Sequence, residues 1–302
     1  MSIHSLRDAS NLPRRIPAFP AASHPASILG DQPALGSPDS IRKESCWDMI
    51  RLSTCPYFSP QSFISLICLL DIGVYALALG VGWESGKFLT PTVTALEEMG
   101  AKDAYKLQVE MEIWRWFCPV MLHANPAHLL FNLFLQAIIG YRLEPSVGWV
   151  DTAIVYWASG CGGVLLSALC SPTTLGVGAS ASILGLVTGT VSFTQLGYLT
   201  VNWTRLSGSV SVQYTLCWLL LMLFMNLMFT SVSSTQGLPG TDVWGHLGGC
   251  IVGYAVGCAL FLPADSDTGK ATLGKAMLAG LGVYFLGGLA LFYMGTEVQP
   301  LR

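Results

Sequence analysis

Histidine, serine and asparagine side chains stand near the starts of three apolar stretches of the sequence. His123, His128 and Asn132 belong to the first stretch, Ser180 to the second and His246 to the third. Burial of such polar side chains at membrane depth is costly, which makes each of them a candidate for function. An imidazole beside a serine hydroxyl can take its proton, and fixed donors nearby can stabilise the oxyanion that forms on an attacked carbonyl. Residues of these types can therefore perform acyl transfer.

The composition places these residues in a membrane protein. Of the 302 residues, 52% are hydrophobic and only 11% are charged, and the mean hydropathy is +0.54, whereas soluble domains carry about 25% charged residues. The net charge of −3 and the absence of a Lys/Arg-rich tract exclude nucleic acid as a partner. The nine cysteines form no Cys-x-x-Cys pair, and we interpret them as buried apolar residues rather than as a zinc or disulfide framework.

Apolar stretches long enough to cross a membrane define the organisation of the chain, because a hydrocarbon core of about 30 Å takes about 20 helical residues. Seven such stretches are expected at residues 62–83, 119–141, 150–170, 176–195, 213–231, 243–263 and 273–295. Residues 84–118 form a long polar loop between the first two. Residues 1–60, rich in Pro, Ser and Ala, predict a disordered cytosolic tail. The sequence therefore predicts an all-α polytopic membrane protein.

The distribution of Lys and Arg sets the orientation of the helices. With a cytosolic N-terminus, ten of the 15 basic residues fall on the cytosolic side and five on the other, as the positive-inside rule favours. The loop 84–118 then faces the lumen or exterior. The second, fourth and sixth spans all run inward from that face, which places four polar residues at similar depth: His123, His128, Ser180 and His246.

Stripes of small residues indicate which helices pack closely. The stripes are Ala181, Gly185 and Gly189 in the fourth span and Gly249, Gly253 and Gly257 in the sixth. Such stripes let two helix backbones come into van der Waals contact. Ser180 adjoins the first stripe and His246 lies one turn before the second, so close packing of these spans would bring hydroxyl and imidazole within hydrogen-bond reach.

Other membrane functions fit the sequence less well. A transporter or channel would show inverted repeats or several mid-span charges, and only Asp71 is a charge of this kind. Metalloproteases and aspartyl proteases of membranes need a His-Glu-x-x-His motif or facing aspartates, and the chain has neither.

Five elements, in order along residues 110–257, resemble the rhomboid family of intramembrane serine proteases, in its eukaryotic secretase-like type. They are Glu112-Ile-Trp-Arg115, His123-x4-His128-x3-Asn132, the pair of segments Gly140–Glu144 and Tyr156–Gly160, Gly178-Ala-Ser180, and His246-Leu-Gly-Gly249. The resemblance implies a rhomboid-like six-helix bundle over residues 61–263, with residues 264–302 adding a loop and a seventh transmembrane helix.

The resemblance also implies roles for the polar residues. Ser180 would be the nucleophile and His246 the general base, while His128, Asn132 and the backbone N–H of Ser180 would form the oxyanion hole. His123 would support that hole. No metal or cofactor is implied. Asp242, one turn before His246, invites comparison with a triad, but the family works with a dyad, and we interpret Asp242 as a solvated loop residue.

Two residues depart from the family pattern and leave an alternative open. Ala181 replaces the usual glycine after the nucleophile, and Leu184 replaces an aromatic residue that commonly stacks on the base. A catalytically weak or inactive relative that binds membrane clients is the alternative to a protease. The expected partners are the lipid bilayer and single-pass transmembrane substrates. The expected location is the secretory pathway (Golgi) or the plasma membrane, and the sequence indicates no oligomeric state.

The orientation generates a prediction about Asn202. Asn202-Trp203-Thr204 matches the acceptor pattern for N-glycosylation, but it follows the fourth span and falls on the cytosolic side. We predict that Asn202 carries no glycan in the expressed full-length protein, as measured by the gel mobility with and without endoglycosidase. A glycan on Asn202 would reverse the side assigned to Ser180 and His246.

Overall fold

The computed structural model describes residues 58–195, 242–260 and 268–301. Five long helices of the described chain are α3 (Phe63–Val81), α6 (Pro126–Val147), α7 (Trp149–Cys170), α8 (Ser180–Gln195) and α10 (Val243–Leu260). The last helix starts as α11 (Thr268–Gly282) and continues through η6 (Val283–Gly287), α12 (Gly288–Ala290) and η7 (Leu291–Gly295). No strand occurs among the described residues, only two isolated bridges.

The fold is that of an all-α polytopic membrane protein, as the sequence predicts. Within the described residues, α3, α7, α10 and Thr272–Gly295 are long and apolar enough to cross a membrane. The polar residues of α6, among them Asn132 and Gln136, lower its hydropathy. The expected span at 213–231 and nearly all of the expected tail at 1–60 lie outside the described residues.

The second span begins later than expected. We predict a helix from residue 119, but residues Cys118–Met121 form a 3-10 turn, η5, and α6 starts at Pro126. The side chain of Asn125 accepts a hydrogen bond from the N–H of His128 at 2.9 Å and caps the helix. Proline is favoured in the first turn, where its missing N–H costs nothing. His123 therefore lies just before the helix rather than in it.

The fourth span also begins later than expected, at Ser180 instead of 176. Residues before it are extended: Lys102 and Gly176 exchange backbone hydrogen bonds of 2.8 and 3.1 Å across an antiparallel bridge. Gly178 has φ +126°, which L side chains rarely adopt, and its N–H donates to the carbonyl of Pro119 at 2.8 Å. These contacts hold the chain away from a helix until Ser180.

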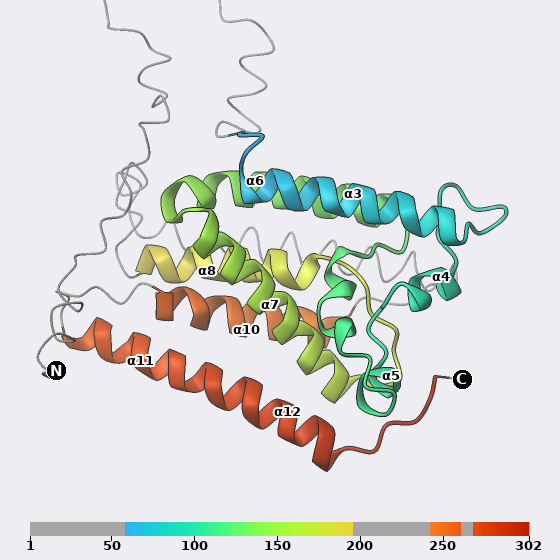
Figure 1. Cartoon of the computed structure of the whole chain (residues 1–302). Coiled ribbons are helices and arrows are strands. Elements are labelled where there is room, and N and C mark those ends of the chain that lie inside the picture. The colour runs from blue at the N-terminus through green and yellow to red at the C-terminus, as the bar shows by residue number, and fades with distance from the viewer. Residues whose placement is uncertain (1–57, 196–241, 261–267, 302) are drawn as a thin grey trace, which may run out of the picture. The chain divides into compact units, whose positions relative to one another are not determined.

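The expected loop 84–118 is an ordered cap rather than a featureless connection. It contains α4 (Val93–Glu98), α5 (Ala104–Gln108) and η4 (Ile113–Trp116). Buried Arg115 donates to the carbonyls of Glu97 and Ala101, each at 2.8 Å, and pairs with Glu112 at 2.5 Å. The loop lies at the end of the bundle where α8 and α10 begin (Figure 1).

Two buried polar contacts join α3 to α6. The carboxylate of Glu144 accepts from the N–H groups of Phe63 and Ile64 at 2.8 and 3.1 Å, and so caps α3 from a neighbouring helix. The mid-span charge Asp71 accepts from Gln136 at 2.9 Å, and Gln136 in turn accepts from the hydroxyl of Tyr156 on α7 at 2.7 Å. Asp71 thus belongs to a structural network.

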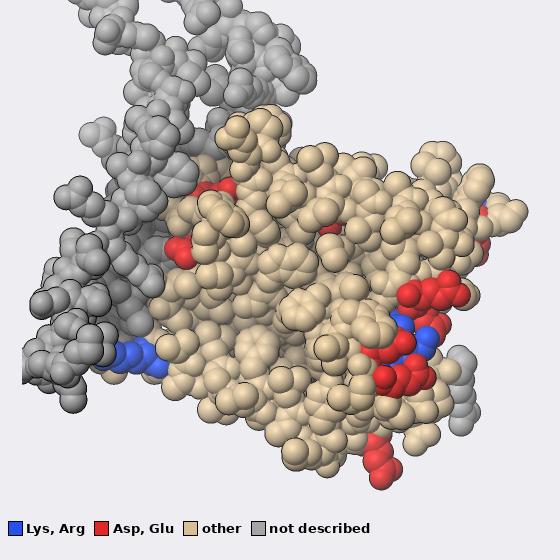
Figure 2. All heavy atoms as spheres, viewed as in Figure 1, with Lys and Arg blue, Asp and Glu red and all other residues tan. Residues whose placement is uncertain are grey.

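The seventh-span helix packs against α10 with α11 and against α7 with its later part, and its end reaches the loop. The hydroxyl of Tyr284 donates to the carbonyl of Gly162 at 2.7 Å. Near its end, the carbonyl of Thr296 accepts from the side chain of Gln108 at 2.8 Å. Figure 2 shows that charged side chains on this face gather at the two ends of the helices and are nearly absent between them. An uncharged belt with charged ends is the distribution that a bilayer demands.

The predicted close packing of α8 on α10 is confirmed. A methyl group added to Gly249 would lie 2.2 Å from the carbonyl oxygen of Ala181, and one added to Gly253 would lie 2.3 Å from the Cα atom of Gly185. Farther along, Thr188 donates its hydroxyl to the carbonyl of Cys250 at 2.9 Å. The two backbones therefore touch over the length of both stripes.

This contact predicts the effect of Gly253→Ala. The new methyl would meet backbone atoms of α8, which cannot rotate away, so the helices must separate, at a cost of about 1–3 kcal/mol or more. We expect a lower thermal unfolding midpoint in detergent. Gly280→Ala on α11 is the matched control, since no atom lies within 4 Å of its added methyl, and its midpoint should stay equal or rise. Equal midpoints for the two variants would contradict the close packing.

Candidate active site

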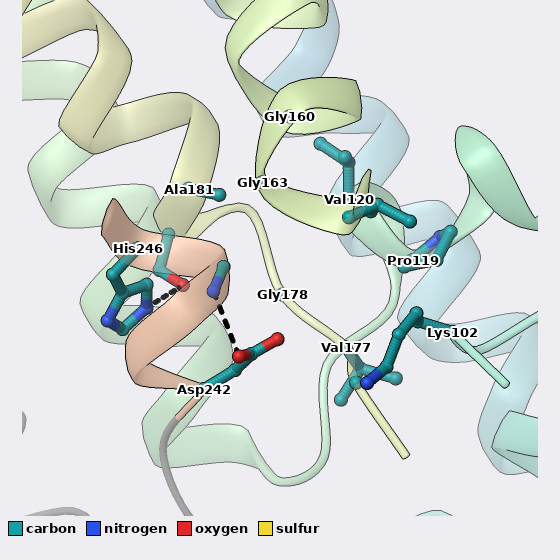
Figure 3. A pocket seen from close by; sticks show the side chains of 14 residues that line it. Lys102, Pro119, Val120, Gly160, Gly163, Val177, Gly178, Ala181, Asp242 and His246 are labelled. Carbon is teal, nitrogen blue, oxygen red and sulfur yellow. Dashed lines mark hydrogen bonds between the residues drawn. The ribbon is translucent and has the colours of Figure 1, made fainter. Parts of the chain in front are cut away.

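Ser180 and His246 meet where α8 and α10 cross. Ser180 is the first residue of α8, and His246 lies in the first turn of α10. The Oγ atom of Ser180 is 2.6 Å from the Nε2 atom of His246, a hydrogen bond drawn as a dashed line in Figure 3. The geometry agrees with the expectation from the small-residue stripes, although 66 residues separate the two in sequence.

The position of Ser180 also exposes backbone donors. The first N–H groups of a helix have no intrahelical partner, and Ser180, as the first residue of α8, contributes one of them. The helix N-terminus carries partial positive charge, which favours an anion nearby. The hydroxyl and the backbone amide of Ser180 are thus both available at one end of α8.

His128 and Asn132 lie beside the extended segment, residues 176–178, that leads to Ser180. A methyl group at Gly178 would be 2.7 Å from the ring of His128 and 3.6 Å from the Nδ2 atom of Asn132. The Nδ2 atom of Asn132 is buried and has no hydrogen-bond partner in the described part of the chain. A buried donor without a partner costs free energy, of order 1–3 kcal/mol, and at a binding site it is available to a ligand.

His123 supports the same region from the turn before α6. Its ring is fully buried and makes an edge-on contact with the ring of His128, with ring centroids 5.2 Å apart. Neither of its ring nitrogens has a hydrogen-bond partner among the described residues. The structure therefore brings all five candidate residues into one region, with His123 behind His128.

A pocket opens beside Ser180 and His246, and its lining includes two charged residues that the sequence analysis did not place there, Lys102 and Asp242 (Figure 3). Lys102 comes from the long loop and is almost fully buried, and its ammonium donates to the carbonyl of Ser171 at 2.9 Å and to the hydroxyl of Thr174 at 3.1 Å. Burial lowers the pKa of Lys102 to about 8, although the carboxylates of Asp242 and Asp103 oppose this shift.

Asp242 is a partly exposed residue just before α10, as we expect, but it also has a structural role. Its carboxylate accepts a hydrogen bond from the N–H of Gly245 at 2.9 Å, and its carbonyl accepts from the N–H of His246 at 3.1 Å. Asp242 is therefore the N-cap of α10. An acidic residue directly before an apolar stretch is the usual signature of such a cap, and it could have identified this role.

The two departures from the family pattern are accommodated in the packing. The methyl group of Ala181 lies against Gly163 of α7, where a second methyl would come within 2.6 Å of it. Leu184, one turn below Ser180, is buried in the main hydrophobic core. The extra methyl of Ala181 is therefore matched by a glycine on the neighbouring helix.

Comparison with known proteins gives a consistent family. The Rhomboid domain matches residues 110–263, just over half of the chain. "RHOMBOID-like protein 6, mitochondrial" of Arabidopsis thaliana is 35% identical over 59% of this chain and 54% of its own length. "RHOMBOID-like protein 1" of the same plant is 34% identical over 67% of this chain and 52% of its own length.

A third relative is covered more completely. "Rhomboid-like protease 2" of Toxoplasma gondii is 30% identical over 70% of this chain and 70% of its own length. The chain spans about half the length of the two plant relatives. From the domain match and the coverage of the Toxoplasma protein, the chain belongs to the rhomboid family.

Proposed function

We propose that the protein is an intramembrane serine protease in which Ser180 and His246 form the catalytic dyad. The observation that carries the proposal is the 2.6 Å hydrogen bond between Ser180 Oγ and His246 Nε2 at the edge of a pocket. Membership of the rhomboid family supports it, as does the name of the Toxoplasma relative. This geometry favours an enzyme over an inactive client-binding relative, since a binding role needs no hydroxyl aligned with an imidazole.

The first half of the reaction forms an acyl-enzyme. Nε2 of His246 takes the hydroxyl proton of Ser180 while Oγ attacks the carbonyl carbon of the peptide bond. The negative charge that develops on the carbonyl oxygen is held by the N–H of Ser180, the side chain of Asn132 and that of His128. The tetrahedral intermediate collapses when its C–N bond breaks, and His246 gives the proton to the leaving amine.

The second half releases the acyl group. Water attacks the ester carbon while His246 takes one of its protons, a second oxyanion forms in the same hole, and the C–Oγ bond breaks with return of the proton to Ser180. The products are a new carboxyl terminus and a new amino terminus. Every proton passes through Nε2 of His246, which explains why its distance from Oγ matters.

We propose single-pass transmembrane proteins as substrates. Carbonyl groups of a stable helix are occupied by hydrogen bonds, so a substrate must unwind locally before Ser180 can attack it. Glycine and other weak helix formers near the outer membrane face lower this cost. The residues that line the pocket include Gly176 and Gly178, which present no side chain to a bound substrate.

We further propose that the N-terminus is cytosolic and that the protein resides in the secretory pathway (Golgi) or the plasma membrane. Ten of the 15 Lys and Arg residues fall on the same side of the membrane as the N-terminus, which supports the orientation. Phe88→Asn provides the positive control for the unmodified Asn202, because it creates an acceptor with Thr90 in the long loop. Phe88 is 78% exposed, so the change is compatible with the fold.

The dyad predicts non-additive losses. Ser180→Ala and His246→Ala should each abolish cleavage of a tagged single-pass substrate, and the double variant should be little worse, because the two residues act as a unit. All three variants should express and unfold at a midpoint close to that of the wild type. Cleavage by Ser180→Ala near the wild-type rate would refute the nucleophile assignment. If the fold losses in cleavage rate of the two single variants multiplied in the double variant, the two residues would not act as a unit.

The oxyanion hole predicts a partial loss for Asn132→Ala. Removal of one preorganised donor costs about 10²–10³ in rate and leaves the nucleophile in place. We expect residual turnover in that range and an unfolding midpoint close to that of the wild type. Ser167→Ala is the matched control, since Ser167 is another buried polar group without a partner among the described residues but does not line the pocket. Equal rates for both variants would make Asn132 a packing residue only.

A further inference from the structure

The carboxylate of Asp242 is held between the two parts of the chain that carry the dyad. On one side it caps α10, whose first turn bears His246. On the other side it faces Gly176 of the extended segment that leads to Ser180, where an added methyl would be 3.5 Å from the Oδ2 atom. Asp242 is thus hydrogen-bonded to the helix that bears the base and lies near the extended segment that leads to the nucleophile.

Glycine residues make room for this carboxylate. A methyl added to Gly245 would lie 2.7 Å from Oδ2 of Asp242, and glycine at this position lets the side chain fold over the first turn. One carboxylate oxygen, Oδ1, accepts the cap hydrogen bond from Gly245. The carboxylate lines the same pocket as Ser180 and His246. The cap therefore holds the carboxylate at the pocket that Ser180 and His246 also line.

Three charged or titratable groups share this surrounding. Lys102 of the long loop and His246 of α10 line the pocket together with Asp242. The ammonium of Lys102 is engaged with the carbonyl of Ser171 and the hydroxyl of Thr174. Within the described part of the chain, no carboxylate is hydrogen-bonded to the imidazole of His246. The imidazolium that forms during acyl transfer therefore has Asp242 as the negative charge of its own pocket.

We propose that Asp242 is a positioning residue of the active site, which fixes the first turn of α10 by its cap and stabilises the imidazolium of His246 by its charge. This inference rests on the proposed dyad. Opposite charges within a partly buried pocket attract across several ångströms without a hydrogen bond, and the attraction exists only after His246 has taken the proton. It therefore acts on the transition state and leaves substrate binding unchanged.

Two substitutions separate the charge from the cap. Asp242→Asn and Asp242→Ser both retain an oxygen that can accept from the N–H of Gly245, and both remove the charge. We expect kcat to fall about tenfold, equivalent to about 1.4 kcal/mol, with KM and the unfolding midpoint unchanged. Asp242→Ala, which also loses the cap, should lower the unfolding midpoint in addition.

Asp103→Asn is the matched control. Asp103 caps α5 by accepting from the N–H groups of Tyr105 and Lys106, at 2.9 and 3.2 Å, and it acts on Lys102 as Asp242 does. It does not line the pocket. Asp103→Asn removes one negative charge near Lys102, as Asp242→Asn does, and retains an oxygen that can cap α5. We therefore expect kcat to stay at the wild-type value.

The measurement uses the full chain in detergent micelles, with a quenched peptide substrate and, separately, with a fluorophosphonate that labels Ser180. Wild-type kcat in both charge-free variants overturns the proposal, and so does a higher KM at unchanged kcat, which would make Asp242 a substrate contact. An equal fall in Asp103→Asn also overturns it. Failure of the wild type to cleave or to be labelled would instead refute the proposed protease function.

Discussion

The close contact between α8 and α10 is the constraint on which the site depends. Gly249 and Gly253 admit the backbone of α8 at distances that any larger residue would prevent. Ser180 and His246 stand at the ends of the two helices beside this contact, so the 2.6 Å hydrogen bond between them follows from backbone packing. In a membrane, where lipid competes equally for apolar surface, such tight packing of small residues is a main source of helix association.

The second requirement is a way to stop α8 from starting too early. Positive φ at Gly178 and the backbone pairing of Gly176 with Lys102 keep residues 176–178 extended. Ser180 consequently occupies the first helical position, where its N–H is not consumed by the helix. The partner of Gly176 is Lys102 of the long loop, and hydrogen bonds from buried Arg115 to backbone carbonyls stabilise that loop. The position of Ser180 therefore depends on the loop 84–118 as well as on the helices.

Sequence reasoning succeeded where one periodic signal decided the outcome. Hydrophobic length located α3, α7 and α10 to within a few residues, and the small-residue stripes correctly paired α8 with α10. It failed at helix starts: apolar content continues through residues 119–125, but Asn125 and Pro126 set the true beginning of α6. A hydropathy window averages over such capping residues, whereas a single side-chain hydrogen bond determines where the helix begins.

The sequence did not predict that Lys102 lines the pocket or that Asp242 caps α10, and the physical reason differs between the two residues. Lys102 pairs with Gly176 across 74 positions of sequence, and nothing local to either residue encodes that bridge. Asp242, by contrast, carries a local signal, since an aspartate before an apolar stretch is a typical N-cap. Comparison with a triad considers a carboxylate near a histidine only as a hydrogen-bonding third member, and so it misses the cap. As a cap, Asp242 organises the first turn of α10, and the charge that we propose it supplies to the pocket is a second effect, which a comparison with a triad does not separate from the first.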